Sequence, residues 1–174
     1  VYKRQNQDKK TFENVTVQRF ESTIAPPIKQ AVVKKFDVSR PKIALGIRLP
    51  ESGLTGQEAT KFILVADILS DILFGEQTDW YQNLYNKGII DTEFETSFDL
   101  LRRYQFVSFF SETTEYDKLT DAIEKQIANY RTVLAGQMTS FESLRRATLG
   151  EGIQRLNSLE SIALRGDDVL FGTN

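Results

Sequence analysis

The chain has 174 residues and a formal net charge of -2, with 40% hydrophobic and 26% charged residues. These proportions are ordinary for a folded globular protein and unlike those of disordered chains. The net charge supplies no basic field for nucleic acid, and the apolar runs are much shorter than a membrane span. We therefore expect one folded domain that binds neither nucleic acid nor a membrane.

Cysteine and histidine are both missing from the sequence. Their absence excludes thiolate chemistry, disulfides, imidazole general bases and nearly every protein zinc site. We therefore predict that this chain contains no catalytic residue, no metal site and no cofactor. The lack of cysteine is compatible with a cytoplasmic location, which we expect for this protein.

The first third of the sequence predicts a lead-in followed by short strands. Residues 1–14 are polar and aperiodic, which indicates a disordered or linker segment, and residues 15–174 are expected to form a single domain. Alternating apolar residues predict strands over residues 15–21, 30–38 and 43–49. Because the sequence opens at Val1 without a recognisable pattern, we interpret it as a fragment of a longer protein.

Helical spacing of apolar residues follows the predicted strands. It predicts a helix from Thr55 or Gly56 to about Gly75, with apolar side chains on more than one stripe, so this helix should pack on two sides. A short helix with Asp79 as its N-cap should come next and end near Gly88.

Two alternating runs, residues 94–100 and 104–110, predict a β-hairpin with Arg102 and Arg103 between its strands. Apolar residues occupy both faces of the second run. The sheet should therefore be covered by helices on one face and by another layer or a partner on the other.

The last third of the sequence predicts two helices. Thr114 should cap the first, which ends at Gly136, and a capping box of Thr139 and Glu142 should open a longer one that runs toward Gly166. In chain order the elements predict an α+β fold, in which a largely antiparallel sheet with a split β-α-β connection carries helices on one face.

Carboxylates are the remaining candidates for chemistry. Asp67 and Asp71 lie four residues apart on the first helix, but like-charged neighbours on a helix surface are usually solvated, and we assign them no role. A Ser/Lys pairing is unmarked by any motif. Arg102 and Arg103 are interpreted as solvated charges at the hairpin tip.

Four segments together resemble the second, non-catalytic half of the insulinase-type (pitrilysin-type) zinc peptidases, and most closely a bacterial subgroup of them. Their order and spacing carry the resemblance, which extends over about residues 41–165. The segments are residues 68–75 (ILSDILFG), 80–91 (WYQNLYNKGIID), 141–146 (FESLRR) and 156–163 (LNSLESIA).

The resemblance implies two homologous α+β halves that enclose a cavity, with zinc bound in the first half through an inverted H-x-x-E-H motif. This chain has no histidine, so zinc is expected in the partner half. In active relatives an Arg after the helix Leu and a Tyr several residues later contact the substrate backbone. Here Tyr85 follows Leu84 in the place of that Arg, and Asp91 lies near the place of the Tyr.

The expected function is therefore a non-catalytic wall of a peptide-binding chamber in a parent zinc metalloendopeptidase. The partner is the catalytic half of the same protein or a homologous subunit. Aromatic side chains on the sheet and the short helix are the candidate peptide-binding residues, because aromatics bury a large area and peptides can pair with strand edges. They are Tyr85, Phe94, Phe98, Tyr104 and Phe106.

Two other interpretations remain open. The chain could be a binding or assembly domain whose parent has lost zinc peptidase activity, or an unrelated enzyme that uses carboxylates alone. The second alternative requires two acids with strongly shifted pKa values in one pocket.

Overall fold

The computed structural model describes residues 31–101 and 104–161. The described residues 35–101 and 104–161 belong to one compact unit, and residues 31–34 belong to a different unit. The predicted lead-in over residues 1–14, the predicted strand over residues 15–21 and the Arg102-Arg103 pair lie outside the described residues.

A three-stranded antiparallel sheet with the strand order β1-β3-β2 forms one layer of this unit. The strands are β1 (Lys42–Leu49), β2 (Glu95–Leu101) and β3 (Tyr104–Glu112). Leu45 of β1 and Thr96 of β2 both lie opposite Phe109 in the central strand. The strand predicted over residues 43–49 and the hairpin predicted over residues 94–110 are confirmed.

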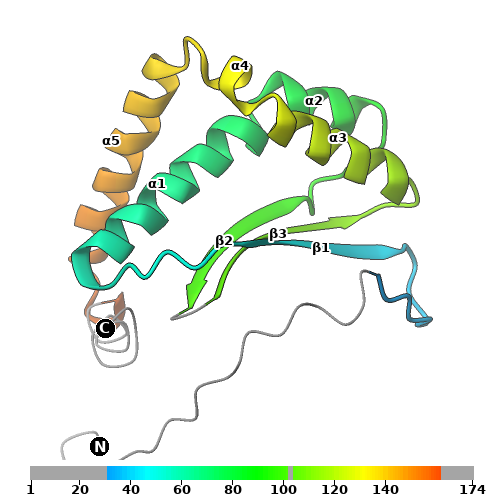
Figure 1. Cartoon of the computed structure of the whole chain (residues 1–174), viewed down its shortest axis with the longest axis horizontal. Coiled ribbons are helices and arrows are strands. Elements are labelled where there is room, and N and C mark those ends of the chain that lie inside the picture. The colour runs from blue at the N-terminus through cyan, green and yellow to red at the C-terminus, as the bar shows by residue number, and fades with distance from the viewer. Residues whose placement is uncertain (1–30, 102–103, 162–174) are drawn as a thin grey trace, which may run out of the picture. The chain divides into compact units, whose positions relative to one another are not determined.

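The helices lie on one face of this sheet, as Figure 1 shows. This arrangement confirms the predicted α+β class, with an antiparallel sheet and helices on one side. In chain order the helices are α1 (Gly56–Phe74), α2 (Asp79–Asn86), α3 (Tyr116–Ala128), α4 (Tyr130–Leu134) and α5 (Met138–Arg155).

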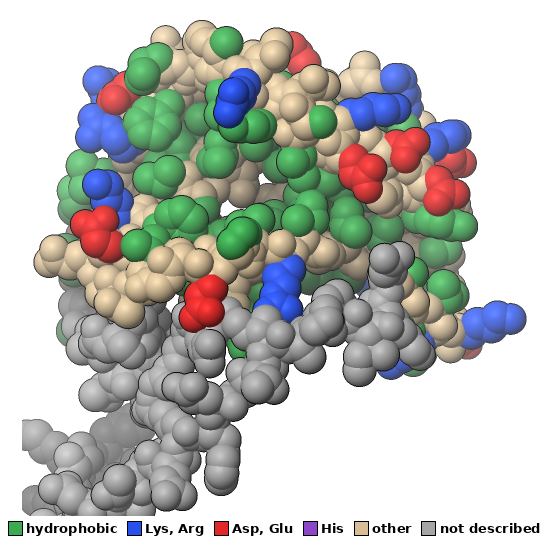
Figure 2. All heavy atoms as spheres, in the orientation of Figure 1, with side chains coloured by type: hydrophobic (Ala, Val, Ile, Leu, Met, Phe, Trp, Pro, Cys, Tyr) green, Lys and Arg blue, Asp and Glu red, His purple; other side chains and the backbone are tan. Residues whose placement is uncertain are grey.

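The hydrophobic core fills the space between the helices and the sheet (Figure 2). Phe109 of β3 is 2% exposed and meets Phe74 of α1 edge to face, with ring centroids 5.0 Å apart. Burying one such side chain stabilises the fold by roughly 1.5–3 kcal/mol. The most buried core residues come from α1, α2, the α2–β2 loop, β3 and α3: Leu73, Phe74, Tyr81, Leu84, Ile90, Phe94, Phe109, Leu119 and Ile123.

The strand predicted over residues 30–38 is wrong for the described residues 31–38, which are irregular. Val32, Phe36 and Val38 supplied the alternating pattern, and all three side chains are exposed. A strand is stabilised by a neighbouring strand and a buried face, and this segment has neither among the described residues.

Three predicted N-caps are also wrong. Thr78 instead of Asp79 caps α2, because its hydroxyl accepts a hydrogen bond from the Tyr81 amide at 3.1 Å. Glu115 instead of Thr114 occupies the N-cap position of α3. Gln137 precedes α5, so Thr139 lies inside the first turn and cannot form a capping box with Glu142.

The predicted ends of the C-terminal helices also need correction. The helix expected to run to Gly136 is divided at Asn129 into α3 and α4. The last helix ends at Arg155 instead of continuing without a break toward Gly166, because residues 156–157 form a turn before residues 159–161 become helical again. The Ser158 hydroxyl then accepts from the Ser161 amide at 3.2 Å, which is the geometry of an N-cap before the helical residues 159–161.

Helix α1 packs on two sides as predicted, against β2 of the sheet and against α5. Phe62, Leu64 and Val65 in its first half nevertheless stay exposed. Across the described part of the chain, none of the helices has the length and apolar character needed to cross a membrane.

Candidate functional site

The face of the sheet that points away from the helices is the first candidate surface, and we call it the open face. Arg48 of β1 and Asp99 of β2 both lie opposite Phe106 of the central strand, so the three residues share this face. The Arg48 guanidinium lies 5.4 Å from the centroid of the Tyr104 ring, within the range of a cation–π contact. Phe110, four residues beyond Phe106 on the same face, is 43% exposed.

The structure places the five candidate aromatic residues in three different environments. Phe94 is buried in the core beside Trp80, and Phe98 faces the helices, where it meets Phe62 edge to face at 5.5 Å. The remaining three do not all lie together. Tyr104 and Phe106 share the open face, whereas Tyr85 lies on α2, where it is exposed and stacks on Tyr81.

Asp91, which the resemblance to the peptidases places near a substrate-contacting position, is held by its own neighbours. Its Oδ2 atom lies 2.7 Å from Nη1 of Arg40, and its Oδ1 atom accepts from the Glu93 amide at 3.0 Å. The Tyr81 hydroxyl donates to the Asp91 carbonyl oxygen at 3.3 Å. These contacts give Asp91 a structural role at the entry to β2.

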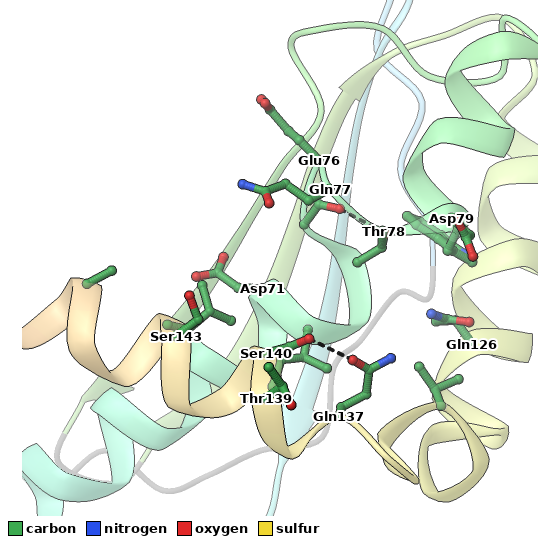
Figure 3. A pocket seen from close by; sticks show the side chains of 16 residues that line it. Asp71, Glu76, Gln77, Thr78, Asp79, Gln126, Gln137, Thr139, Ser140 and Ser143 are labelled. Carbon is green, nitrogen blue, oxygen red and sulfur yellow. Dashed lines mark hydrogen bonds between the residues drawn. The ribbon is translucent and has the colours of Figure 1, made fainter.

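A cleft on the helical side of the unit is the second candidate surface, and we call it the polar cleft. It has a volume of about 980 Å³ and lies between α1, the α1–α2 turn, α3, α4 and the start of α5 (Figure 3). Its lining residues are Asp71, Ile72, Gly75, Glu76, Gln77, Thr78, Asp79, Trp80, Gln126, Val133, Gln137, Thr139, Ser140, Ser143, Leu144 and Ala147.

The turn between α1 and α2 forms one wall of the polar cleft. A Cβ atom on Gly75 would lie 2.4 Å from the carbonyl oxygen of Asp71, so only glycine allows the chain to leave α1 in this way. The Thr78 hydroxyl then donates to the Gly75 carbonyl at 2.8 Å. The same hydroxyl caps α2, so the turn and the helix after it are fixed together.

Hydrogen bonds from side chains hold the other walls. The Trp80 indole donates to the Ala122 carbonyl at 3.4 Å, and Nε2 of Gln126 donates to the Leu73 carbonyl at 2.7 Å, so both residues tie α3 to the α1–α2 region. At the start of α5, the Ser140 hydroxyl donates to Oε1 of Gln137 at 2.8 Å (Figure 3).

The charged residues that line the polar cleft are all acidic: Asp71, Glu76 and Asp79. Burial raises the pKa of Asp71, and the carboxylate of Glu151 on α5 raises it further. The pKa of Asp67, one turn earlier on α1, is raised by burial and then by the carboxylates of Asp71 and Asp99. Both side chains are nevertheless exposed at the helix surface, as the sequence predicted for like-charged neighbours four residues apart.

The polar cleft was not predicted from the sequence, because its lining residues come from separate helices and meet only when these helices pack. In the sequence, Thr139 and Ser143 fit the pattern of a helix, and no motif marks Gln126 as a binding residue. Only an orientation of α5 along α1 brings Ser143 to the same space as Asp71.

The residues present do not fit a zinc site. The sequence contains neither histidine nor cysteine, and no described part of the chain gathers three or more Asp or Glu side chains in an arrangement that could hold a metal ion. The carboxylates of the polar cleft therefore do not replace the usual zinc ligands.

Comparisons with known proteins find a similar sequence and a similar fold. No protein-family model matches the chain. A protein of Bacillus subtilis (strain 168) named "Uncharacterized zinc protease YmfH" is 29% identical over 175 residues, which is 92% of this chain and 37% of that protein. The chain therefore spans little more than a third of the length of this relative.

The fold has a counterpart among solved structures. The crystal structure of an M16-like peptidase from Alicyclobacillus acidocaldarius matches with a TM-score of 0.63 and 24% identity, over 73% of this chain and 30% of that one. The sequence match to a protein named as a zinc protease and the fold match to an M16-like peptidase confirm the predicted resemblance to the insulinase-type (pitrilysin-type) zinc peptidases.

Proposed function

We propose that this chain is the non-catalytic half of an insulinase-type zinc metallopeptidase, in which it forms part of the wall of a peptide-binding chamber opposite a zinc-bearing half. One observation carries the proposal. The chain matches a protein named as a zinc protease over 92% of its own length, yet it contains no histidine. In such a protein the zinc ligands would have to come from outside this sequence.

The open face of the sheet supports a role as a wall. Helices cover the other face, whereas Phe110 remains 43% exposed and Tyr104 and Phe106 lie on the same side. Exposed aromatic groups on a rigid sheet bury a large area at little entropic cost, which suits an extended peptide or a partner layer. The proposed partner is the catalytic half of the same protein or a homologous subunit.

A second candidate function is a binding or assembly domain in a parent without peptidase activity. The Arg40–Asp91 contact favours this candidate, because Asp91 is engaged in structure near the position where active relatives place a substrate-binding Tyr. A cytoplasmic location remains a prediction under both candidates.

Cleavage of a quenched-fluorescent peptide library tests the proposal. The 174-residue chain and the full-length protein that contains it are assayed with and without a metal chelator. We expect cleavage by the full-length protein alone, and the chelator should abolish it. Cleavage by the isolated chain would contradict the proposal, and failure of both proteins to cleave would favour the binding or assembly domain.

A further inference from the structure

The polar cleft has no part in the proposed peptidase function, and its lining has a distinct chemistry. Its volume of about 980 Å³ lies at the upper end of the range of small-molecule pockets. Trp80, Val133 and Leu144 give it an apolar part. The rest of the lining is rich in oxygen acceptors, and it includes no Lys or Arg.

Several of these acceptors retain hydrogen-bonding capacity. Ser143 and Thr139 make no side-chain hydrogen bond with another described residue, and the exposed carboxylate of Asp71 forms no ion pair within the described ranges. Asp71 on α1 and Ser143 on α5 both point into the space between the two helices (Figure 3). A hydroxyl can accept a hydrogen bond as readily as it donates one, so these groups suit a ligand rich in N–H donors.

The acidic lining of the polar cleft favours a positively charged ligand. Asp71, Glu76 and Asp79 approach from the end of α1, the turn and the start of α2, and no cation offsets them within the lining. The raised pKa of Asp71 has the same origin, because burial and Glu151 both disfavour its charged form. Asp79 lies in the first turn of α2, where its charge is favourable to the helix dipole, so Asp71 and Glu76 are the carboxylates available to a ligand.

We propose that the polar cleft binds an amphipathic cation, with an alkyl stem against Trp80 and Leu144 and an ammonium or guanidinium group at Asp71 and Ser143. A Lys or Arg side chain of a protein segment and a free polyamine share this chemistry. The alkyl stem covers apolar surface while the charged group meets oxygen acceptors, as basic side chains do elsewhere in proteins. The proposal is independent of the peptidase assignment.

Isothermal titration of the 174-residue chain tests this site. The probes are an acetylated tri-arginine amide, spermidine and, as a control of opposite charge, an acetylated tri-glutamate amide. We expect saturable binding of at least one cation and none of the tri-glutamate. Stronger binding of tri-arginine would identify a protein segment as the source of the cation, and stronger binding of spermidine a polyamine.

Variants decide whether binding occurs in the polar cleft. Asp71→Asn should weaken cation binding by about 3- to 10-fold, because a charge-assisted hydrogen bond at a partly exposed position is lost. Ser143→Phe fills the space without a change of charge and should reduce binding at least as much. Glu124→Gln removes a carboxylate from an exposed position of α3 that lies outside the lining, and it should leave binding unchanged.

The proposal is overturned if neither cation binds saturably, or if Asp71→Asn and Ser143→Phe both leave affinity unchanged. Equal losses in Glu124→Gln and Asp71→Asn would also overturn it, because they would indicate general attraction to an acidic surface. Circular dichroism and thermal melting identify a variant that fails to fold, in which case the other cleft variant decides the outcome.

Discussion

Helices α3 and α5 were both predicted from helical spacing of apolar residues, but the structure buries them very differently. Leu119 and Ile123 of α3 are each 1% exposed and belong to the core, whereas no residue of α5 is buried. Leu149 and Ile153, four residues apart on α5, are 62% and 57% exposed. The apolar residues of α3 gather on one face and those of α5 do not, so a few apolar residues at helical spacing predict that a helix forms without predicting that it is buried.

Shortening one leucine in each helix should show the difference between α3 and α5 most clearly. Leu119→Ala is expected to lower the free energy of unfolding by about 2–5 kcal/mol, because it leaves a cavity in a packed core. Leu149→Ala should change it by less than about 0.5 kcal/mol, because the side chain is already exposed. Urea denaturation followed by circular dichroism measures both. Similar losses in the two variants would show that α5 has a buried partner in the chain.

The N-termini of α2 and α5 offer a smaller contrast. Thr78→Ala removes the hydroxyl that caps α2 and should cost about 1 kcal/mol. Thr139→Ala should cost clearly less, because Thr139 lies inside the first turn of α5 and forms no capping box. Urea denaturation measures the free energy of unfolding of both variants. A larger loss of stability in Thr139→Ala than in Thr78→Ala would support the capping box predicted from the sequence.

The smallest expected effect concerns Asp67. Its pKa is raised in the folded chain by burial and by the carboxylates of Asp71 and Asp99, so its ionised form disfavours folding. The penalty is present above the raised pKa and disappears as the pH falls through that value toward the ordinary pKa of an aspartate. Asp67→Asn should therefore be slightly more stable than the wild type at pH 7.

The difference between Asp67→Asn and the wild type should shrink as the pH is lowered from 7 toward 4. Thermal melting at a series of pH values measures it, with Asp121→Asn at an exposed position of α3 as the control. An Asp67→Asn variant that is less stable than the wild type at pH 7 would show that the carboxylate is stabilising.

The sequence predicts the elements of this fold better than their ends and partners. The strand over residues 43–49 and the hairpin were predictable because alternation coincides with burial on one face, as Leu45 opposite Phe109 shows. Residues 31–38 show the same alternation without a partner strand among the described residues, and they are irregular. An alternating pattern indicates that a segment can form a strand. Whether it joins a sheet depends on a neighbouring strand that the rest of the fold must supply.

The candidate surfaces were less predictable than the fold. Phe98 and Phe106 both belong to alternating runs, yet one faces the helices and the other the open face, because register assigns each residue to a side. The polar cleft depends on how α5 lies along α1, which no local signal in residues 137–147 reveals. The predicted cap of α2 failed because Thr78 and Asp79 are neighbours that can both serve as an N-cap, and the sequence alone does not decide between them.

The role of this chain as a chamber wall is tested most directly by the kinetics of the full-length protein. In a double variant, Tyr104→Ala with Phe106→Ala, we expect a raised KM for peptide cleavage with kcat and bound zinc unchanged, because the open face contributes binding and no chemistry. Leu149→Ala on α5 is the control and should behave as the wild type. Unchanged KM in a double variant that melts at the wild-type temperature would contradict the account.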